Sequence, residues 1–393
     1  MIRKNSVESL DFNHCCGCRL CADICPKESI TFEIDYEGFY YPKVNTNTCI
    51  DCGLCYQKCP ELNQAFNNES KFAISAIAKD KAIHNQGSSG GVFPLLAKFV
   101  LNQNGKVYGA AFDDVIQLKH IGIDKTEDLS PLCKSKYLQS DCSGIYIQII
   151  KELKDGKKIL FCGTPCQCQA LNNAIENNKY RNNLILIDFV CHGVSCQKLF
   201  DDNIRYYSKK YGKILSYQFR NKEKAKYHQS FSISYNNGSC TKTLKGTYYK
   251  DPYYYGYERR ITLRPACYNC KWATLKRCSD ITMSDFFGIT DRDSRIKDNY
   301  VSCVFCNTKE GLTLFNEIKA DLNFVHNYPV ELAREKNECL RHPVKMPNER
   351  NNFFKSWITL GFNSVRKEYL SPKHKLIYDL FYAIPINIRK LIR

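Results

Sequence analysis

The chain has 393 residues, of which 44% are hydrophobic and 25% charged. This composition excludes an intrinsically disordered protein, and the length predicts two or three domains. Lysine and arginine exceed aspartate and glutamate by 17. The longest apolar runs, 74–78 and 184–190, are far shorter than the ~20 residues that span a bilayer, and the first residues lack the apolar core of a signal peptide. We therefore expect a cytoplasmic protein whose 23 cysteines bind metal rather than form disulfides.

The first predicted domain, residues 1–66, is built on an internal repeat. CCGCRLCADICP (15–26) and CIDCGLCYQKCP (49–60) share the spacing C-x2-C-x2-C-x3-C-P. Between them, SITFEIDYEGFYYPKV alternates apolar and polar residues around Tyr36, Glu37 and Gly38, which predicts a β-hairpin.

This cysteine spacing is typical of a bacterial-type ferredoxin with two [4Fe-4S] clusters. Three cysteines of one half wrap one cluster, and the fourth completes the cluster of the other half. The alternative, a pair of four-cysteine zinc sites, does not require the third cysteine and the trailing Cys-Pro in both halves. Cys16 receives no role. The rule assigns Cys15, Cys18, Cys21 and Cys59 to cluster one, and Cys49, Cys52, Cys55 and Cys25 to cluster two.

After a polar linker at 63–70, strand and helix patterns alternate, which predicts an α/β core. The expected strands are 72–78, 105–113, 157–163 and 184–193, and the expected helices are 92–101, 145–156 and 197–212. Short alternating stretches in 214–250 predict an antiparallel insertion, and the last 44 residues have helical spacing. The predicted fold class is thus α+β / α/β, divided into 1–66, 70–165, 166–345 and a basic helical tail at 350–393.

Four motifs follow the ferredoxin repeat in a characteristic order. They are NQGSSGGVFPLLA (85–97), KYLQSD with LFCGTPCQCQAL (136–141 and 160–171), DFVCHGVS (188–195) and RPACYNCKWATLKRCSDITMSDFFGI (264–289). Together they resemble the coenzyme F-420 hydrogenase/dehydrogenase beta-subunit family, in its bacterial branch with an N-terminal 2x[4Fe-4S] ferredoxin domain. Ser284 and Phe287 depart from the glycine and tryptophan common in that family. The resemblance implies an iron–sulfur flavoprotein oxidoreductase, with FAD bound by the α/β core and a third [4Fe-4S] cluster beside it.

The resemblance also implies which residues hold the third cluster. Cys278 is a rival ligand, and Cys162, Cys168 and Cys196 are expected to be buried core thiols. The implied ligands are Cys166, Cys191, Cys267 and Cys270.

The implied flavin contacts lie in the first two of these motifs. A glycine-rich run before a helix can cradle a pyrophosphate with backbone amides, although such a run is also common as a plain loop or helix cap. Neither GxGxxG nor GxxxxGK[ST] occurs, so no Rossmann or ATPase site is indicated. His192 is a candidate proton donor, and its alternative is a packing or capping role. The expected contacts are Gly87, Ser88, Ser89, Gly90, Gly91, Lys136, Tyr137, Gln139, Ser140, Thr164 and Pro165.

The predicted function is an enzyme that takes electrons from a ferredoxin-like donor and delivers them through FAD to an organic substrate. The relatives suggest a small molecule or glycan intermediate of polysaccharide biosynthesis. The alternative is an electron-transfer subunit that reduces a deazaflavin coenzyme or a partner enzyme. Nucleic-acid binding is not expected, because the lysines are spread out and no nucleic-acid motif occurs. The tail either docks on the core or makes a peripheral membrane contact.

Overall fold

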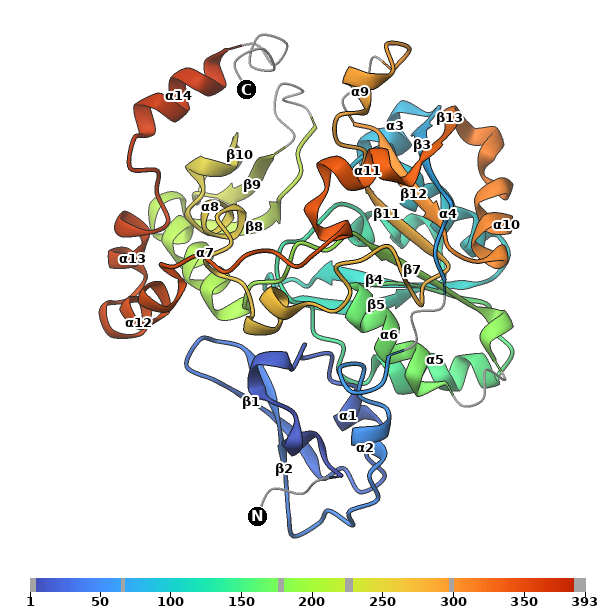
Figure 1. The fold of residues 1–393 in the computed structure, drawn as a ribbon. Coiled ribbons are helices and arrows are strands. Elements are labelled where there is room, and N and C mark those ends of the chain that lie inside the picture. The colour runs from blue at the N-terminus through green and yellow to red at the C-terminus, as the bar shows by residue number, and fades with distance from the viewer. Residues whose placement is uncertain (1–4, 65–67, 176–179, 223–228, 297–299, 385–393) are drawn as a thin grey trace.

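The computed structural model describes residues 5–64, 68–175, 180–222, 229–296 and 300–384. Parts of the predicted linker and tail therefore lie outside the described residues. In Figure 1 the N-terminal ferredoxin unit lies below the rest of the molecule. Above it, a large sheet with its helices stands beside a smaller sheet and the C-terminal helices.

The ferredoxin unit contains the predicted hairpin and one short helix in each half of the repeat. The strands pair antiparallel, with Ile34 opposite Tyr40, and Gly38 takes φ +84° in the turn. The backbone is left-handed at Arg19 and Gly53, immediately before the two helices. These elements are β1 (Ile30–Ile34), β2 (Tyr40–Val44), α1 (Leu20–Asp23) and α2 (Leu54–Gln57).

The core is one mixed sheet of eight strands in the order β13-β3-β12-β11-β7-β6-β4-β5. The four neighbours β11, β7, β6 and β4 run parallel, and the outer pairs are antiparallel. The strands are β3 (Phe72–Ala78), β4 (Lys106–Phe112), β5 (Leu118–Ile123), β6 (Ile159–Cys162), β7 (Leu184–Phe189), β11 (Ile281–Asp285), β12 (Ser302–Cys306) and β13 (Leu322–Pro329).

The predicted parts 70–165 and 166–345 share this sheet. Strand β3 of the first part lies between β13 and β12 of the second, and the boundary at 165/166 falls in the first turn of α6 (Pro165–Ala174). The strands β12 and β13 follow the insertion in sequence, yet both pair with β3, which precedes it.

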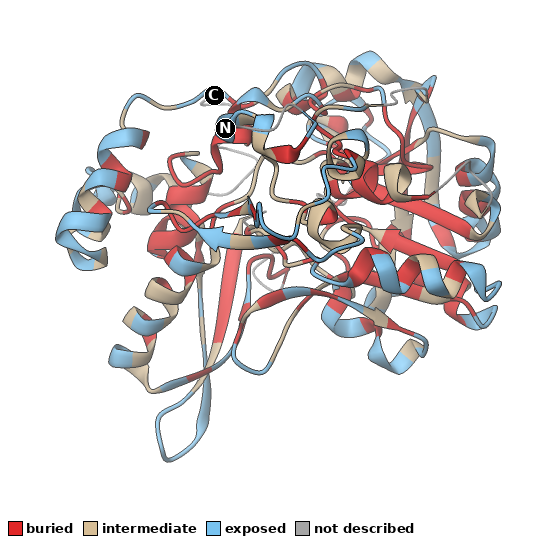
Figure 2. Ribbon diagram, turned by 90° about the horizontal axis from the view of Figure 1, so that it is seen from below, coloured by how far each residue is buried: buried red, intermediate tan, exposed pale blue. Residues whose placement is uncertain are grey.

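Helices cover the sheet through apolar faces. In α5 (Ile145–Lys154), the buried residues Ile145, Ile149 and Leu153 recur every four positions, as one face of a helix requires. Figure 2 shows the strands of the large sheet mostly buried and the outward helix faces exposed. The other helices of this part are α3 (Lys81–Gln86), α4 (Val92–Asn102), α9 (Ile289–Arg292), α10 (Lys309–Glu317) and α11 (Val330–Lys336).

The insertion is the predicted antiparallel unit, a sheet in the order β10-β9-β8. It packs with α7 (Gln197–Tyr211) and α8 (Pro252–Glu258). Its strands are β8 (Lys213–Gln218), β9 (Ser230–Asn236) and β10 (Thr241–Thr247). The mixed α/β fold behind a ferredoxin unit, with a helical tail, is confirmed.

The tail contains α12 (Arg350–Leu360), α13 (Phe362–Glu368) and α14 (Lys375–Ala383). Phe353, Phe354 and Trp357 of α12 are buried, so this helix docks on the core. Among the described residues, no helix is long and apolar enough to cross a membrane.

Candidate functional site

The four cysteines assigned to cluster one line a single cavity in the ferredoxin unit. Cys15, Cys18, Cys21 and Cys59 all face it, and it contains about 340 Å³ of space not filled by atoms, part of it open to solvent. Gly17 lies between these ligands with φ +67°, a conformation that favours glycine. The repeat thus brings three cysteines of the first half to the last cysteine of the second.

The cysteines assigned to cluster two lie farther from the core. Cys25, Cys49 and Cys55 pack against the small apolar core of the ferredoxin unit. The backbone N–H of Ser29 donates to Cys25 Sγ at 3.3 Å. Cys52 is exposed, so this group of cysteines reaches the protein surface.

The four cysteines that the resemblance assigns to a third cluster line a second cavity. Cys166 follows β6, and Cys191 follows the neighbouring parallel strand β7, so their loops meet at one edge of the sheet. Cys267 and Cys270 come from the turn 265–270, which is tied to this edge by the N–H of Arg264 bonded to Val194 O. The cavity encloses about 530 Å³, part of it open to solvent.

The buried thiols fit a positively charged inorganic core. Burial raises the pKa of Cys59 and of Cys267 to about 12. Burial, and then the neighbouring Cys267 and Cys166, raise the pKa of Cys191. These cysteines are therefore protonated when no cluster is bound. Binding of a positively charged iron–sulfur core would displace the thiol protons and compensate the charge of the thiolates. Among the described residues, no three cysteine, histidine or acidic side chains could hold a single metal ion.

The rival cysteine lies elsewhere. Cys278 is buried, does not line either cavity, and has a pKa that burial and Asp188 raise. Of the three expected core thiols, Cys168 and Cys196 are buried and Cys162 is half-buried.

The ferredoxin unit docks on the core through the first cysteine loop. Gln139, which the resemblance assigns to the flavin, donates from Nε2 to Cys16 O at 2.9 Å and Gly17 O at 3.1 Å. The fully buried Arg264 donates to Cys15 O at 2.6 Å and to Gln139 Oε1 at 2.9 Å. A Cβ on Gly17 would lie 2.7 Å from both core side chains, so only glycine allows this approach.

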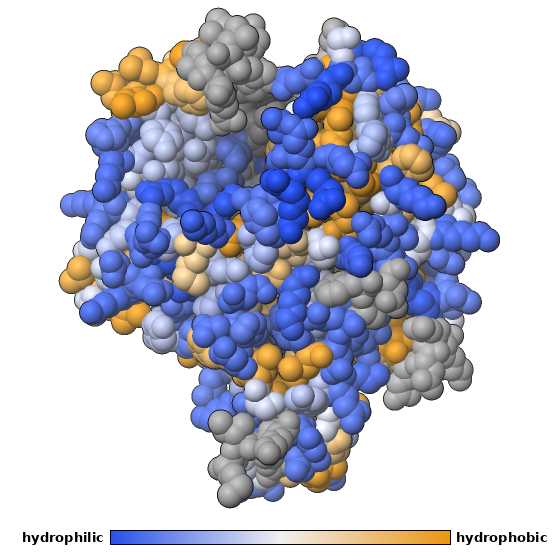
Figure 3. All heavy atoms as spheres, in the orientation of Figure 1, coloured by the Kyte–Doolittle hydropathy of each residue, from blue (hydrophilic) through white to orange (hydrophobic). Residues whose placement is uncertain are grey.

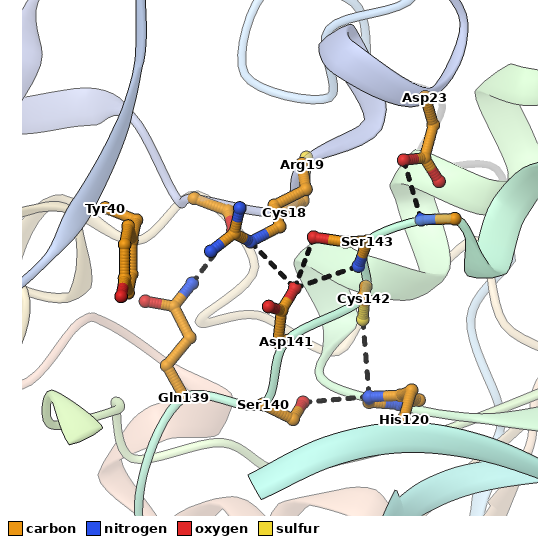
Figure 4. Close-up of polar contacts among 12 residues, drawn as sticks. Cys18, Arg19, Asp23, Tyr40, His120, Gln139, Ser140, Asp141, Cys142 and Ser143 are labelled. Carbon is orange, nitrogen blue, oxygen red and sulfur yellow. Dashed lines mark hydrogen bonds and ion pairs between the residues drawn. The ribbon is translucent and has the colours of Figure 1, made fainter. Parts of the chain in front are cut away.

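Figure 4 shows the second half of this interface. Arg19 Nε lies 2.8 Å from Asp141 Oδ1, and Asp23 accepts the N–H of Gly144 at 2.9 Å. The hydroxyl of Tyr146 donates to Cys18 O at 3.0 Å. The first cysteine loop, with the cysteines assigned to cluster one, is therefore fixed against the segment 139–146.

The glycine-rich run forms the loop between α3 and α4, and a buried arginine joins it to Tyr137. Arg220 donates to Ser88 O at 3.1 Å and Tyr137 Oη at 3.3 Å, and pairs with Asp285 through bonds of 2.9 and 3.2 Å. Ser89 Oγ and Arg220 Nε are buried without a hydrogen-bond partner among the described residues. These donors suit the phosphates of FAD.

Gly87 and Gly90 of this loop already use their N–H groups inside the protein. The first donates to Ile83 O at 3.1 Å and the second to Ser302 Oγ at 2.9 Å. Gly91 is the N-cap residue of α4, with φ +85°. At least two backbone amides of the predicted run are thus used inside the protein.

Other predicted flavin contacts are engaged within the protein. Lys136 donates to Pro131 O at 2.8 Å and Cys133 O at 2.7 Å, and burial lowers its pKa to about 8. Ser140 Oγ lies 2.8 Å from Nδ1 of the buried His120.

Thr164 and Pro165 line the second cavity, which holds the cysteines assigned to the third cluster. Thr164 caps α6 and its hydroxyl lies 3.1 Å from Cys166 Sγ. Gln167 holds this cap, because its Oε1 accepts the N–H of Thr164 at 2.9 Å. Gln167 also donates to Ser140 Oγ at 3.1 Å, so a hydrogen-bonded chain links the segment after β5 to a presumed ligand.

His192 lines the same cavity, and its Nε2 lies 3.2 Å from Asn337 Oδ1. Burial lowers its pKa, which favours the neutral ring. Sequence reasoning missed Arg264, Arg220 and Gln167. The first and last stand inside the RPACYNC and LFCGTPCQCQAL motifs, but nothing in the sequence indicates that these polar side chains are buried.

Two family models match the chain. Residues 14–62 match the 4Fe-4S dicluster domain, and residues 156–327 match the C terminus of the coenzyme F420 hydrogenase/dehydrogenase beta subunit. No curated protein matches. Thirteen chains of solved structures match. One, from the F420-reducing [NiFe] hydrogenase complex of Methanosarcina barkeri, has 16% identity and a TM-score of 0.45, over 77% of this chain and 97% of that chain.

Proposed function

Because residues 14–62 are a 4Fe-4S dicluster domain and residues 156–327 belong to the coenzyme F420 hydrogenase/dehydrogenase beta-subunit family, we propose that the chain is an iron–sulfur flavoenzyme. Electrons enter from a ferredoxin-like donor at the dicluster domain. They pass to a third [4Fe-4S] cluster held by Cys166, Cys191, Cys267 and Cys270, and then to FAD on the α/β core. The final acceptor is an organic substrate.

The observation that carries this proposal is the adjacency of the two cysteine-lined cavities. Each is lined by four cysteines assigned to one cluster, and they share Cys16 and Glu61 in their walls. Cluster two, with the exposed Cys52, is the entry point, and cluster one faces the core. Clusters in this sequence would carry electrons from the protein surface to the edge of the sheet.

The flavin site of the proposal lies on the same edge. Arg220 and Ser89 offer buried donors to the phosphates, and Tyr137 stacks on Tyr257 with ring centroids 4.6 Å apart. The Tyr257 hydroxyl donates to Gly193 O at 3.2 Å, in the turn that carries Cys191. FAD, when bound, would supply the exchange between single electrons and electron pairs. His192, which lines the second cavity, is the proposed proton donor to the substrate. It would donate from its protonated form, which burial disfavours.

Metal and flavin analysis of anaerobically purified protein tests the proposal. Three clusters predict about twelve irons per chain, and the ferredoxin unit alone predicts about eight. Cys267→Ala should lose the third cluster, whereas Cys278→Ala should keep it. Protein with eight irons, or without flavin after reconstitution, would contradict the proposal.

An electron-transfer subunit is the second candidate, because the matched family model describes the beta subunit of a hydrogenase/dehydrogenase. In that case a deazaflavin coenzyme or a partner enzyme takes the electrons. Turnover of an organic substrate by the purified chain with an artificial donor separates the two candidates.

The last described helix supports a peripheral membrane contact as part of the proposal. Leu376, Ile377 and Leu380 of α14 are between 61% and 71% exposed, and Figure 3 shows an apolar patch over this helix. Residues 350–393 carry nine basic and two acidic side chains, which suits an anionic lipid surface. A lipid-linked glycan intermediate is the substrate class that such a contact would serve.

Co-sedimentation with phosphatidylglycerol vesicles tests this contact. The double variant Leu376→Asp and Leu380→Asp should lose binding. The matched control Leu312→Asp, on the exposed face of α10, should retain it. Absence of binding by the unmodified chain at low salt would remove this part of the proposal.

A further inference from the structure

Cys16 is the cysteine of the ferredoxin repeat that the ligand spacing does not assign to a cluster. It stands between Cys15 and Gly17 in the first loop and has no counterpart in the second half of the repeat, where Ile50 occupies the position. Its side chain lines both the cavity of cluster one and the cavity of the proposed third cluster. Cys18, which lines the first of these cavities, and Cys166, which lines the second, both influence the pKa of the Cys16 thiol.

The core holds this loop in place from two directions. Gln139 and Arg264 bind the carbonyls of Cys15, Cys16 and Gly17 at 2.6 to 3.1 Å. Arg264 also donates to Tyr40 O at 2.9 Å, so the hairpin and the first loop share one clamp. Because these bonds are made to the backbone, they fix the position of the loop whichever side chain stands at position 16.

We propose that Cys16 is the electron-transfer contact between the ferredoxin unit and the core, with its sulfur bridging a ligand of cluster one and a ligand of the third cluster. The inference rests on the proposed function, since it requires a cluster in the second cavity. Each transfer oxidises the donor cluster by one electron and reduces the acceptor by one. No bond or proton changes at Cys16.

The geometry favours Cys16 over the other residue shared by the two cavities. Glu61 also lies in both walls, but its carboxyl group carries no sulfur. The sulfur of Cys16 is polarizable, and its side chain lies in both walls, beside Cys15 and Cys18 in one cavity and Cys166 in the other. At Cys16 one side chain therefore belongs to both cavity walls.

Rapid-freeze EPR of the full chain, mixed with a substoichiometric reductant, tests the proposal. The variants are Cys16→Ala and Cys16→Ser. The control is Cys303→Ala, which removes a buried thiol from β12 that lines neither cavity. Iron content and the midpoint potentials of all clusters should stay at wild-type values. The rate at which the third cluster becomes reduced should fall about tenfold in both Cys16 variants, and it should not change in the control. A tenfold effect is about the lower end of what is found when a residue that supports the ligands of a metal site is removed.

An unchanged rate in the Cys16 variants would overturn the proposal. Loss of about four irons in these variants would also overturn it, because Cys16 would then be a ligand. Failure of the proposed function gives a different result. The unmodified chain would itself contain no third cluster, whatever residue stands at position 16.

Discussion

Replacing Arg350 by methionine tests how the ferredoxin unit is fastened to the rest of the chain. Arg350 begins α12 and makes two bonds, of 2.9 and 2.5 Å, to the carboxylate of Glu37 in the hairpin turn. Both side chains are at most 5% exposed. Methionine leaves the Glu37 carboxylate buried without its partner, which typically costs about 3–5 kcal/mol. We expect the free energy of local opening of the β1–β2 hairpin to fall by this amount.

Native-state hydrogen exchange of the hairpin amides measures that free energy. A loss of about 3–5 kcal/mol corresponds to exchange roughly a hundred- to several thousand-fold faster. The double variant Glu37→Gln with Arg350→Met is the matched control, because it removes the stranded charge and should recover much of the loss. An Arg350→Met variant within about 1 kcal/mol of wild type, as for exposed ion pairs, would refute the reasoning. So would a double variant as unstable as the sum of the single ones.

Three further predictions concern the core. In Gly90→Ala the new Cβ would lie 2.0 Å from a backbone carbonyl of β3, so chemical unfolding titrations should show a free energy of unfolding lower by at least about 1–3 kcal/mol. In the control Gly109→Ala the nearest contacts are 3.6 Å, so the free energy of unfolding should stay near the wild-type value. Burial lowers the pKa of His120 to about 4. Because its unfolded pKa is about 6.5, the folded state should lose up to about 3 kcal/mol as the pH falls from 6.5 to 4, a dependence absent in His120→Gln. Thr164→Val removes a hydrogen bond to Cys166, so an EPR redox titration should show the third cluster about 60 mV lower. Thr164→Ser should keep the wild-type potential, and an unchanged potential in the valine variant would contradict the assigned bond.

The sequence by itself determined the ferredoxin unit and the kind of core behind it. The cysteine repeat is a local pattern whose ligand rule needs no long-range information, and the match of residues 14–62 agrees with it. Alternating strand and helix patterns predicted β3, β4, β6 and β7, because strands buried in the middle of a sheet read as short apolar runs. The strands β5, β11, β12 and β13 were not predicted. Of these, β12 and β13 pair with β3, more than 200 residues earlier in the sequence, and β11 pairs with the distant β7, whereas β5 pairs with the adjacent β4.

Only the tertiary structure decided how the cysteines and the polar side chains are grouped. Cys166 and Cys191 meet because β6 and β7 are parallel neighbours, a fact of sheet order that no local pattern contains. Gln139 belongs to the same motif as Tyr137, yet it binds the ferredoxin loop, because the first cysteine loop packs there. Sequence spacing identifies groups that share one loop or one element. Contacts between residues more than a hundred positions apart arise from packing, and these contacts place cluster one against the core.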